Sequence, residues 1–417
     1  MEKTVIELFA GVGGFRVGLN NIKKIDKNGR AIEKGNFKFV WANQWEPSTK
    51  MQQAFNCYNK RFSSSSSENS NIDISLVDKK LIPNHTLLCG GFPCQDYSVA
   101  RSLYNERGIE GKKGVLWWQI RNILVVKKPP FVFLENVDRL IKSPSKQRGR
   151  DFGIMLRCFY ELGYAVEWRV INAAEYGLPQ RRRRTYIFAY RKNTNFFKQI
   201  KKEKPSSVLF ENGIFAKAFP VFKCDNSIIN QVSLIDKYVD MVDFSDEFKF
   251  CFENTGFMID GTIYTVKSEA IKEKPIPLKN IVQKDVDEHF YLTSEEKAKF
   301  EYLRSSKKIP RIDANGHEYI YSEGAMSKYD DLSLPGRTML TSEGKINRST
   351  HIIKDLKTNR LRFLTPIECE RLNQFPDDWT NDGMAESRRY FIMGNALVCG
   401  VVFRLGKQIE TIIENEK

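Results

Sequence analysis

The chain has 417 residues, 41% of them hydrophobic, and its 66 lysines and arginines against 51 aspartates and glutamates give a formal charge of +15. This size and apolar content support a true core and predict two domains. The basic balance favours a polyanionic partner, nucleic acid before an anionic membrane surface, over a basic protein with no such partner.

The eight cysteines form no CxxC pair and only four histidines accompany them. This composition argues against a structural zinc site and against a disulfide scaffold. The start of the chain lacks the layout of a signal peptide, and no apolar run is long enough to cross a bilayer. We therefore expect a reduced, cytoplasmic protein without a membrane anchor.

The first predicted strand, residues 5–9, leads directly into the glycine-rich stretch of residues 10–14 and then into a helix. A strand, a glycine turn and a helix in this order open many nucleotide-binding units. The glycines let the backbone approach a ligand without interference from Cβ atoms. Arg16 occupies the position of the third glycine in the dinucleotide fingerprint, which disfavours an oxidoreductase of the Rossmann type.

The second predicted strand, residues 37–45, is followed by a polar end. In a doubly wound sheet this end meets the ribose and the base of a nucleotide cofactor. Trp45 would stack on a purine, and either Gln44 or Glu46 would hold the ribose hydroxyls. The alternative is a core tryptophan with polar neighbours at the surface. Asp73, which precedes the third strand, would accept a hydrogen bond from an adenine amino group.

The third predicted strand, residues 86–89, ends in Gly90-Gly91-Phe92-Pro93-Cys94. A thiol on a turn at the carboxyl end of a strand lies where open α/β sheets bind their ligands. The alternative for Cys94 is a small buried apolar residue, the usual role of a free cysteine. The polar, charged segment 96–113 that follows is typical of a mobile lid.

The next predicted strand, residues 131–134, follows a helix at 115–126 and delivers Glu135 to the same edge of the sheet. This carboxylate is either a capping residue or an acid–base group. A helix at 151–162 and a strand at 164–170 come next. Four arginines then run into another strand, and strand alternation places Arg182 and Arg184 on one side of it.

Between residues 193 and 360 the regular βα alternation is lost, which predicts a separate, irregular and mostly β module with short strands at 219–222 and 248–252. A helix then begins after Thr365, because Thr365 suits the N-cap, a proline follows it, and a glutamate stands three residues after it. Residues 393–398 are predicted to open the last helix.

Taken together, these segments resemble the cytosine-5 DNA methyltransferases of the restriction-modification type. The resemblance covers nearly all of residues 4–192 and 361–405, in the family's order. Six motifs carry it: Phe9–Gly14, Gly91–Gln95, Glu135–Val137, the set Gln180, Arg182 and Arg184, the helix region Arg362–Trp379, and Gly394-Asn395.

The resemblance implies an α/β fold with a Rossmann-like, S-adenosylmethionine-dependent methyltransferase domain and a smaller, irregular, mostly β target-recognition domain. The catalytic domain would comprise residues 1–192 plus 388–417, and residues 193–387 would hold target recognition and the joining helix. The implied partner is double-stranded DNA, with a restriction endonuclease acting separately on the same site. We expect a monomer without a metal ion.

The resemblance also implies which residues line S-adenosylmethionine. The sequence departs from the family at two of them, since the family usually has glutamate at Gln44 and often has serine at Ala396. The first departure leaves ribose binding to Gln44 or to Glu46, and the second removes one hydroxyl contact. The implied cofactor residues are Phe9, Gly11, Val12, Gly13, Gln44, Trp45, Glu46, Asp73, Ile74, Gly91, Pro93, Leu116, Asn395 and Ala396.

The implied chemistry uses Cys94 as the nucleophile that adds to carbon 6 of a cytosine flipped out of the duplex. Glu135 would share a proton with the ring nitrogen. Arg184, with Arg182 nearby, would donate to the base oxygen and favour the thiolate.

Two other functions fit the same fold. An RNA cytosine-5 methyltransferase, as in the transfer-RNA branch of the family, is disfavoured because that branch lacks a large module such as residues 193–360. A catalytically inactive DNA-binding regulator is disfavoured because Cys94, Glu135 and Arg184 are all present.

Overall fold

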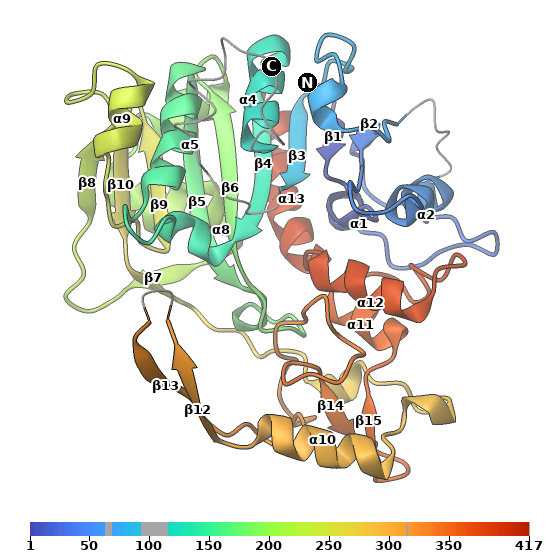
Figure 1. The fold of residues 1–417 in the computed structure, drawn as a ribbon. Helices are drawn as coiled ribbons and strands as arrows, with labels where there is room; N and C mark the ends of the chain where they lie inside the picture. Colours follow the sequence, from blue (N-terminus) through green and yellow to red (C-terminus); the bar gives the residue numbers. More distant parts are fainter. Residues whose placement is uncertain (63–68, 93–115, 314–315, 417) are drawn as a thin grey trace.

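The computed structural model describes residues 1–62, 69–92, 116–313 and 316–416. Its centre is a nine-stranded sheet in the order β2-β1-β3-β4-β6-β5-β9-β10-β8 (Figure 1). The neighbours from β2 to β4 are parallel, and all later neighbours are antiparallel. The strands of this sheet are β1 Thr4–Leu8, β2 Lys38–Asn43, β3 Leu87–Gly91, β4 Phe131–Val137, β5 Tyr164–Asn172, β6 Arg183–Arg191, β8 Asn230–Ser233, β9 Thr255–Ile259 and β10 Thr262–Val266.

Two apolar cores lie on the two faces of the sheet. Successive side chains of a strand point to opposite faces and so contribute to both cores. In β4, Phe131 and Phe133 lie in one core, and Val132 and Leu134 lie in the other. Helices α1, α2, α6, α8 and α13 pack in the first core, and α4, α5 and α9 pack in the second. Their bounds are α1 Gly14–Leu19, α2 Gln53–Phe62, α4 Leu116–Lys127, α5 Arg150–Glu161, α6 Asn195–Ile200, α8 Ile214–Ala218, α9 Met241–Glu247 and α13 Cys399–Glu414, with the short α7 Pro205–Ser207 between α6 and α8.

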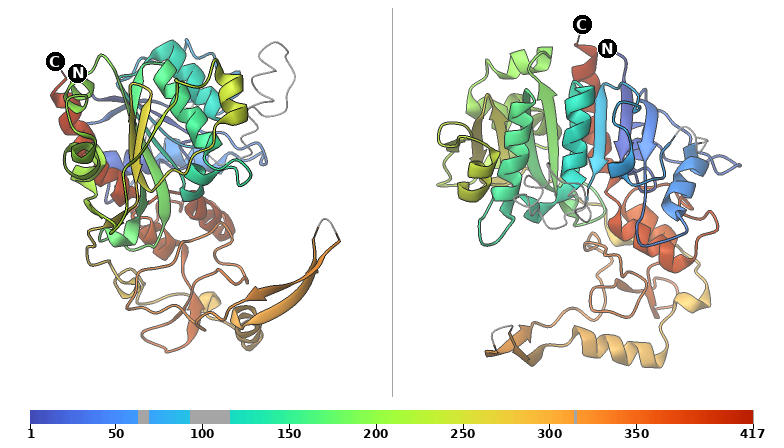
Figure 2. Two further views of the ribbon diagram at one scale, coloured as in Figure 1. Left: turned by 90° about the vertical axis from the view of Figure 1, so that its left-hand side faces the viewer. Right: turned by 45° about the horizontal axis from the view of Figure 1, so that its top comes forward.

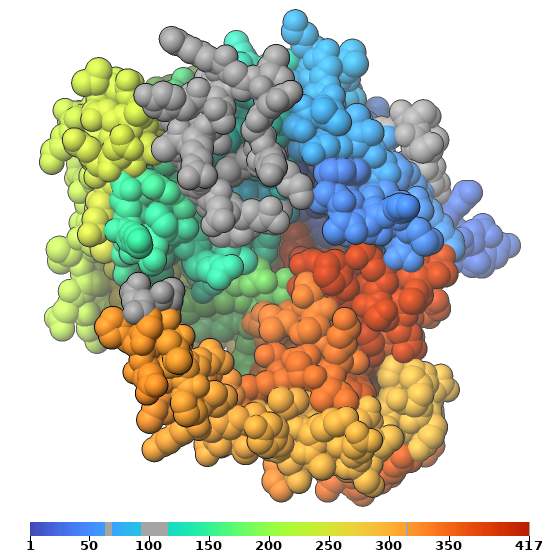
Figure 3. Space-filling view, viewed as in Figure 1, coloured from blue at the N-terminus to red at the C-terminus, as the bar shows by residue number. Residues whose placement is uncertain are grey.

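A smaller lobe, residues 271–363, lies beyond the carboxyl ends of the parallel strands (Figures 1 and 3). It has a small core of its own, made by Leu292, Phe300, Ile352 and Phe363. Two helices, α11 and α12, lie between this lobe and the sheet (Figure 1). The remaining elements are β7 Val221–Lys223, which pairs with β11 Ser268–Ala270, then α10 Ser294–Arg304, β12 Lys307–Ile312, β13 Glu318–Glu323, β14 Ile352–Lys354, β15 Leu361–Phe363, α11 Pro366–Leu372 and α12 Glu386–Asn395.

The expected domain boundary at residue 193 does not coincide with the edge of the sheet. Strands β8 to β10, residues 230–266, extend the sheet next to β5. The contact is tight, because a Cβ atom at Gly256 would lie 2.1 Å from the Trp168 ring. The irregular module predicted from the sequence is therefore divided between the sheet and the smaller lobe.

Two local predictions were wrong. Residues 248–252 form no strand, because the Phe252 ring packs against Phe152 and Trp168, and the rings of Phe248 and Phe250 pack beside it. Residues 393–398 do not open a helix: α12 ends at Asn395 and α13 begins at Cys399. The α/β fold class and the strands of the N-terminal half are confirmed.

Candidate active site

The glycine-rich turn after β1 has a left-handed backbone, with φ of 53° at Phe9, 55° at Gly11 and 89° at Gly13. A Cβ atom at Gly13 would lie 2.4 Å from the Phe62 ring, so packing also requires glycine there. At Gly11, in contrast, a Cβ atom would meet no other atom within 4 Å. The turn therefore presents open backbone at the carboxyl end of β1, where a ligand can approach.

Glu7 lies buried beneath this turn and was missed by the sequence analysis. Its carboxyl group accepts hydrogen bonds from the Phe15 backbone N–H at 3.0 Å and from the Tyr58 hydroxyl at 3.3 Å. Burial raises the pKa of Glu7 to about 8. The one signal in the sequence was a charged residue inside an otherwise apolar strand. Glu7 fixes the first turn of α1 and so the shape of the glycine turn.

The polar segment after β2 is held by contacts to the glycine turn and to α12. The Gln44 side-chain oxygen accepts a hydrogen bond of 2.7 Å from the Gly11 backbone N–H. Glu46 forms an ion pair with Arg388 of α12, a partner that the sequence analysis did not identify. Trp45, between them, is 37% exposed at the edge of the sheet.

The segment before β3 runs beside the end of β2. The Gln44 N–H donates to the Ser70 carbonyl at 3.1 Å, and the Asn43 side chain donates to the Ile72 carbonyl at 3.0 Å. These bonds hold the segment that leads into Asp73 and the buried Ile74 beside the end of β2. Asp73 caps a short 3-10 helix by accepting from the Ser75 N–H at 2.9 Å.

The C-terminal part of the chain returns to this edge. Asn395 is the exposed last residue of α12, and Ala396 follows it half-buried. Leu397 contacts the glycine turn, since a Cβ atom at Gly14 would lie 3.0 Å from it. The Trp379 indole N–H also donates to the Val12 carbonyl at 2.9 Å.

These residues together fit S-adenosylmethionine. Open backbone at Gly11 suits its amino-acid end, the exposed Trp45 ring suits the adenine, and the Asp73 carboxylate suits an amino group. Leu116 is half-buried at the first position of α4, and Gly91 ends β3. The predicted contact Pro93 lies outside the described residues.

Glu135 and Arg184 form a partly buried ion pair at the end of β4. The Arg184 Nε atom lies 3.1 Å from the Glu135 carboxylate, and the side chains are 16% and 13% exposed. Burial raises the pKa of Glu135, against the opposing charges of Arg184 and Arg182. Gly91 lies directly across the β3–β4 ladder, and a Cβ atom there would lie 3.4 Å from Glu135 Oε2. The carboxyl group is thus held ready to carry a proton.

The chain leaves β3 beside this pair. The Asn136 side chain donates a hydrogen bond of 2.9 Å to the Phe92 carbonyl, two residues before Cys94. The sequence analysis named Asn136 only as the middle residue of the Glu135–Val137 motif. This hydrogen bond indicates that Asn136 positions the chain where it leaves β3. Cys94 itself lies outside the described residues, as does the predicted lid at 96–113.

The arginine run alternates as expected: Arg182 is buried, Arg184 is half-buried, and the two other arginines are exposed. The Arg182 guanidinium donates to the carbonyls of Met339 at 3.1 Å and Gly394 at 3.0 Å. Gln180 donates to the Asn373 side chain at 2.9 Å. Arg182 and Gln180 therefore join β6 to the smaller lobe and to the end of α12.

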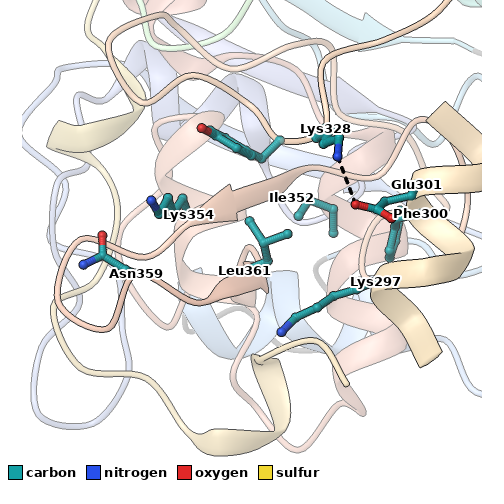
Figure 4. A pocket seen from close by; sticks show the side chains of 9 residues that line it. Lys297, Phe300, Glu301, Lys328, Ile352, Lys354, Asn359 and Leu361 are labelled. Atoms are coloured by element: carbon teal, nitrogen blue, oxygen red, sulfur yellow. Dashed lines mark hydrogen bonds and ion pairs between the residues drawn. The ribbon is translucent and has the colours of Figure 1, made fainter. Parts of the chain in front are cut away.

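A pocket of about 260 Å³ lies on the smaller lobe, between α10 and the β14–β15 hairpin (Figure 4). Its floor is apolar, with Phe300, Ile352 and Leu361. Lysines stand around it, and one of them, Lys328, pairs with Glu301 at 3.2 Å. None of the described lining residues is a cysteine, so this pocket lacks the nucleophile for methyl transfer. Its full lining is Lys297, Phe300, Glu301, Lys328, Tyr329, Ile352, Lys354, Asn359 and Leu361.

Metal sites and membrane spans were searched for in the described ranges. There, no three His, Cys, Asp or Glu side chains are grouped so as to hold a metal ion. In the same ranges, no helix has the length and apolar content needed to cross a membrane. The cysteines that the structure describes are all free thiols.

Comparisons with known sequences point to one family. A family model described as C-5 cytosine-specific DNA methylase matches residues 3–411. Type II methyltransferase M.Sau3AI of Staphylococcus aureus is 51% identical over 410 residues, which cover 98% of this chain and 95% of that protein. Type II methyltransferase M.HhaI of Haemophilus parahaemolyticus is 32% identical over 232 residues, covering 55% of this chain and 61% of that protein.

Solved structures agree on the fold. EhMeth, a methyltransferase of Entamoeba histolytica, superposes with a TM-score of 0.58 at 17% identity, covering 100% of this chain and 99% of that one. A mutant of Spodoptera frugiperda DNMT2 gives a TM-score of 0.58 at 14% identity, covering 98% and 99%. At these identities the likeness shows the fold alone. The function follows from the family model and the relatives, which do not favour an RNA enzyme or an inactive regulator. The chain therefore belongs to the C-5 cytosine-specific DNA methylases, and it transfers a methyl group from S-adenosylmethionine to carbon 5 of cytosine in DNA.

Proposed function

We propose that Cys94, Glu135 and Arg184 form the methyl-transfer centre and act on a cytosine flipped out of a specific duplex sequence. The observation that carries this proposal is the Glu135–Arg184 ion pair at the end of β4. It lies across from Gly91, three residues before Cys94. A carboxyl group and a guanidinium at this position match the proton and the negative charge that the reaction must handle.

In the proposed reaction the Cys94 thiolate adds to carbon 6 of the ring and makes carbon 5 nucleophilic. S-adenosylmethionine supplies the electrophilic methyl group when it is bound. Glu135 gives a proton to the ring nitrogen as charge builds there, and it holds the exocyclic amine. Loss of the carbon 5 proton to a base then expels the thiolate, and Glu135 takes its proton back. The target atoms are inaccessible inside a duplex, so the base must be flipped out.

The two arginines have different roles in this proposal. Arg184, which already contacts Glu135, donates to the base oxygen and favours the thiolate. Arg182 is predicted from the sequence to act in catalysis beside Arg184. Its guanidinium donates to the Met339 and Gly394 carbonyls, which supports a positioning role.

We assign the ribose contact to Gln44. Arg388 engages the Glu46 carboxylate, whereas the oxygen of Gln44 binds Gly11 and leaves its amide nitrogen as a donor. The other cofactor contacts stay as predicted from the sequence, with Trp45 at the adenine and Asn395 at the end of α12.

Duplex DNA that carries 5-fluorocytosine at the target tests the covalent step. Fluorine cannot leave as a proton does, so the wild-type enzyme should form a denaturant-resistant adduct. Cys94→Ala should form none and transfer no methyl group, yet still bind the duplex. Cys251→Ala is the matched control, because Cys251 is an exposed thiol far along the sequence and should keep both activities. Methyl transfer by Cys94→Ala near the wild-type rate would refute the mechanism.

We further propose that the chain modifies the same DNA sequence as M.Sau3AI. The alignment with that relative is 51% identical and covers 98% of this chain, so it includes the smaller lobe, whereas the alignment with M.HhaI covers only 55% of this chain. DNA that M.Sau3AI has methylated to completion should accept no labelled methyl group from this enzyme. DNA methylated by M.HhaI should accept the full amount, and equal labelling of both substrates would exclude a shared target.

The relatives are named Type II methyltransferases, which places the family in restriction-modification systems. We propose that a separate endonuclease cuts the same sequence when it is unmodified, and that the methyltransferase acts as a monomer. Sedimentation of the enzyme with and without its target duplex tests the second point. A dimer at assay concentrations would contradict it.

A further inference from the structure

The hairpin of β12 and β13 projects from the smaller lobe as an arm (Figure 2). Its two strands pair with each other as a two-stranded sheet separate from the large sheet. Its side chains are unusually exposed for their type: Ile312 is 68% exposed, Ile320 65% and Tyr319 46%. Such a group of exposed apolar and aromatic side chains marks an interaction surface.

The pairing of the two strands defines two faces. Arg311 pairs with Tyr319, and Pro310 pairs with Ile320 on the opposite face. The Arg311 guanidinium lies 3.9 Å from the centre of the Tyr321 ring, which holds it in place through a cation–π contact. One face thus carries Arg311, Tyr319 and Tyr321, and the other carries Pro310, Ile312 and Ile320 together with Lys308 and Glu318.

Hydrogen bonds from Arg348 hold the base of the hairpin against the end of α10. Arg348 donates to the Leu303 carbonyl at 2.6 Å, at the end of α10, and to the Glu323 carboxylate at 3.3 Å, at the end of β13. It also donates to the Gly324 carbonyl. Arg304, buried nearby, donates to the Ser327 carbonyl at 2.9 Å. These bonds fix the direction in which the arm leaves the lobe.

The chemistry of the hairpin favours duplex DNA over a second copy of the chain. Pro310 removes a backbone donor from β12, which works against pairing with another strand. Strand β12 carries three cationic side chains and no acidic one. Strand β13 has a glutamate at each end: Glu323 is paired with Arg348, and Glu318 is exposed. A two-stranded ribbon of this kind has the size that the major groove admits.

We propose that the β12–β13 hairpin enters the major groove of the target duplex, where Arg311 reads a base edge and Ile320 packs against bases. This inference rests on the proposed action of the enzyme at a specific duplex sequence. Arginine donates in pairs to guanine, and apolar side chains contact the thymine methyl group. The rigid base of the hairpin gives these side chains a defined register relative to the flipped cytosine.

Arg311→Ala in the full-length enzyme tests the proposal. We expect kcat/KM on the target duplex to fall roughly 5- to 150-fold, the range for losing one specific base contact. Selectivity against one-base-pair variants of the target should relax at one position. The matched control is Arg360→Ala, since Arg360 is also an exposed arginine that lies over a ring, 4.3 Å from the centre of Tyr291. It loses the same charge and should keep target selectivity.

Ile320→Ser provides a second, independent test, because Ile320 is exposed and lies on the other face. It should relax selectivity at a neighbouring base pair and leave thermal stability unchanged. If both hairpin variants retain the selectivity of Arg360→Ala, the hairpin does not read the target. A hairpin variant that changes the sedimentation of the free enzyme and not its selectivity would assign the surface to self-association instead. Wild-type enzyme that modified DNA without sequence preference would refute the proposed function and not the hairpin alone.

Discussion

Glu135 is the residue whose environment most directly suggests a chemical role. Glu135→Gln should lower the methyl-transfer rate by ~10²–10⁴-fold, because an amide can still hydrogen-bond but cannot deliver the proton that the ring nitrogen needs. Cofactor binding should change little, since the carboxyl group is paired with Arg184 and is not among the predicted cofactor contacts. Single-turnover transfer of labelled methyl groups measures the rate. Glu167→Gln is the control, because Glu167 is also a buried glutamate on a strand of the sheet. A loss below about fivefold for Glu135→Gln would remove it from the mechanism.

Glu7 gives a prediction for stability. Burial raises its pKa from the ordinary 4.5 to about 8. Between these values the folded state keeps a proton that the unfolded state has lost, so this group makes the free energy of unfolding fall as pH rises. Below this window both states are protonated, and above it both are ionised. Glu7→Gln cannot titrate and still offers an oxygen to the Phe15 N–H.

The wild-type protein should therefore lose stability relative to Glu7→Gln across this window, and the difference should level off above about pH 8. Urea unfolding of both proteins at several pH values measures this difference. A difference that does not change with pH would mean that Glu7 is already ionised in the folded protein.

At the residue scale the sequence identified side chains but not their partners. Glu135 and Gln44 were found because each follows an apolar strand. The partner of Glu46 was not found, because Arg388 lies 342 residues further along the chain. Glu7 was missed because alternation places it in the core, where a charged group is not expected. Long-range pairs of this kind depend on tertiary packing, which periodicity does not encode.

At the scale of elements, the sequence predicted the start of a helix correctly where every residue of a capping motif was present. The cap of α11 was predicted from Thr365, a proline and Glu368, and the structure has both hydrogen bonds of a capping box there. Residues 248–252 were misassigned because side-chain packing outweighs their local pattern. Residues 393–398 were misassigned because the backbone is extended at Ala396 and Val398, which separates α12 from α13. The strands of the N-terminal half were predicted well, since buried parallel strands are nearly continuous apolar runs.

The capping boxes of α10 and α11 make a matched pair for measuring stability. Thr365→Ala should lower the free energy of unfolding by about 1–2 kcal/mol, because Thr365 is buried and its hydroxyl also donates to Gln283. Thr293→Ala removes the same motif from α10, where both bonds are exposed to solvent. It should cost only about 0.5–1 kcal/mol. Urea unfolding of the two variants compares them, and a larger loss for Thr293→Ala would contradict the role given to burial.

At the scale of the whole molecule, the sheet and the smaller lobe are joined by shared apolar packing and by specific hydrogen bonds. Leu278, Ile281, Met339 and Ile353 of the lobe belong to the first core. Gln180 accepts from the Met339 N–H at 3.2 Å, and Arg182 donates to the Met339 carbonyl. The lobe has its own core around Phe300 and Ile352. The sequence predicted a separate module but placed its start at residue 193, because the loss of βα alternation does not distinguish antiparallel strands of the sheet from strands of another lobe.

This division leads to a prediction about exchanging target specificity. Replacing residues 271–363 with the equivalent lobe of a methyltransferase of different specificity should give a folded enzyme that methylates the donor's sequence. Replacing residues 193–360 should instead destabilise the catalytic domain. That exchange removes β8 to β10 from the nine-stranded sheet and breaks the packing of Gly256 on Trp168.

Thermal unfolding of both chimeras, and the methylated sequence on plasmids from a host without methylation, measure the two effects. Affinity of the folded chimera for its new target should still fall steeply with salt, because phosphate contacts come from basic side chains of both lobes. A folded, active exchange of residues 271–363 that keeps the original target would place recognition outside the smaller lobe, and the segment 96–113 would then be the next to exchange. A stable exchange of residues 193–360 would show that β8 to β10 are interchangeable between relatives, and that the sheet tolerates a new edge next to β5.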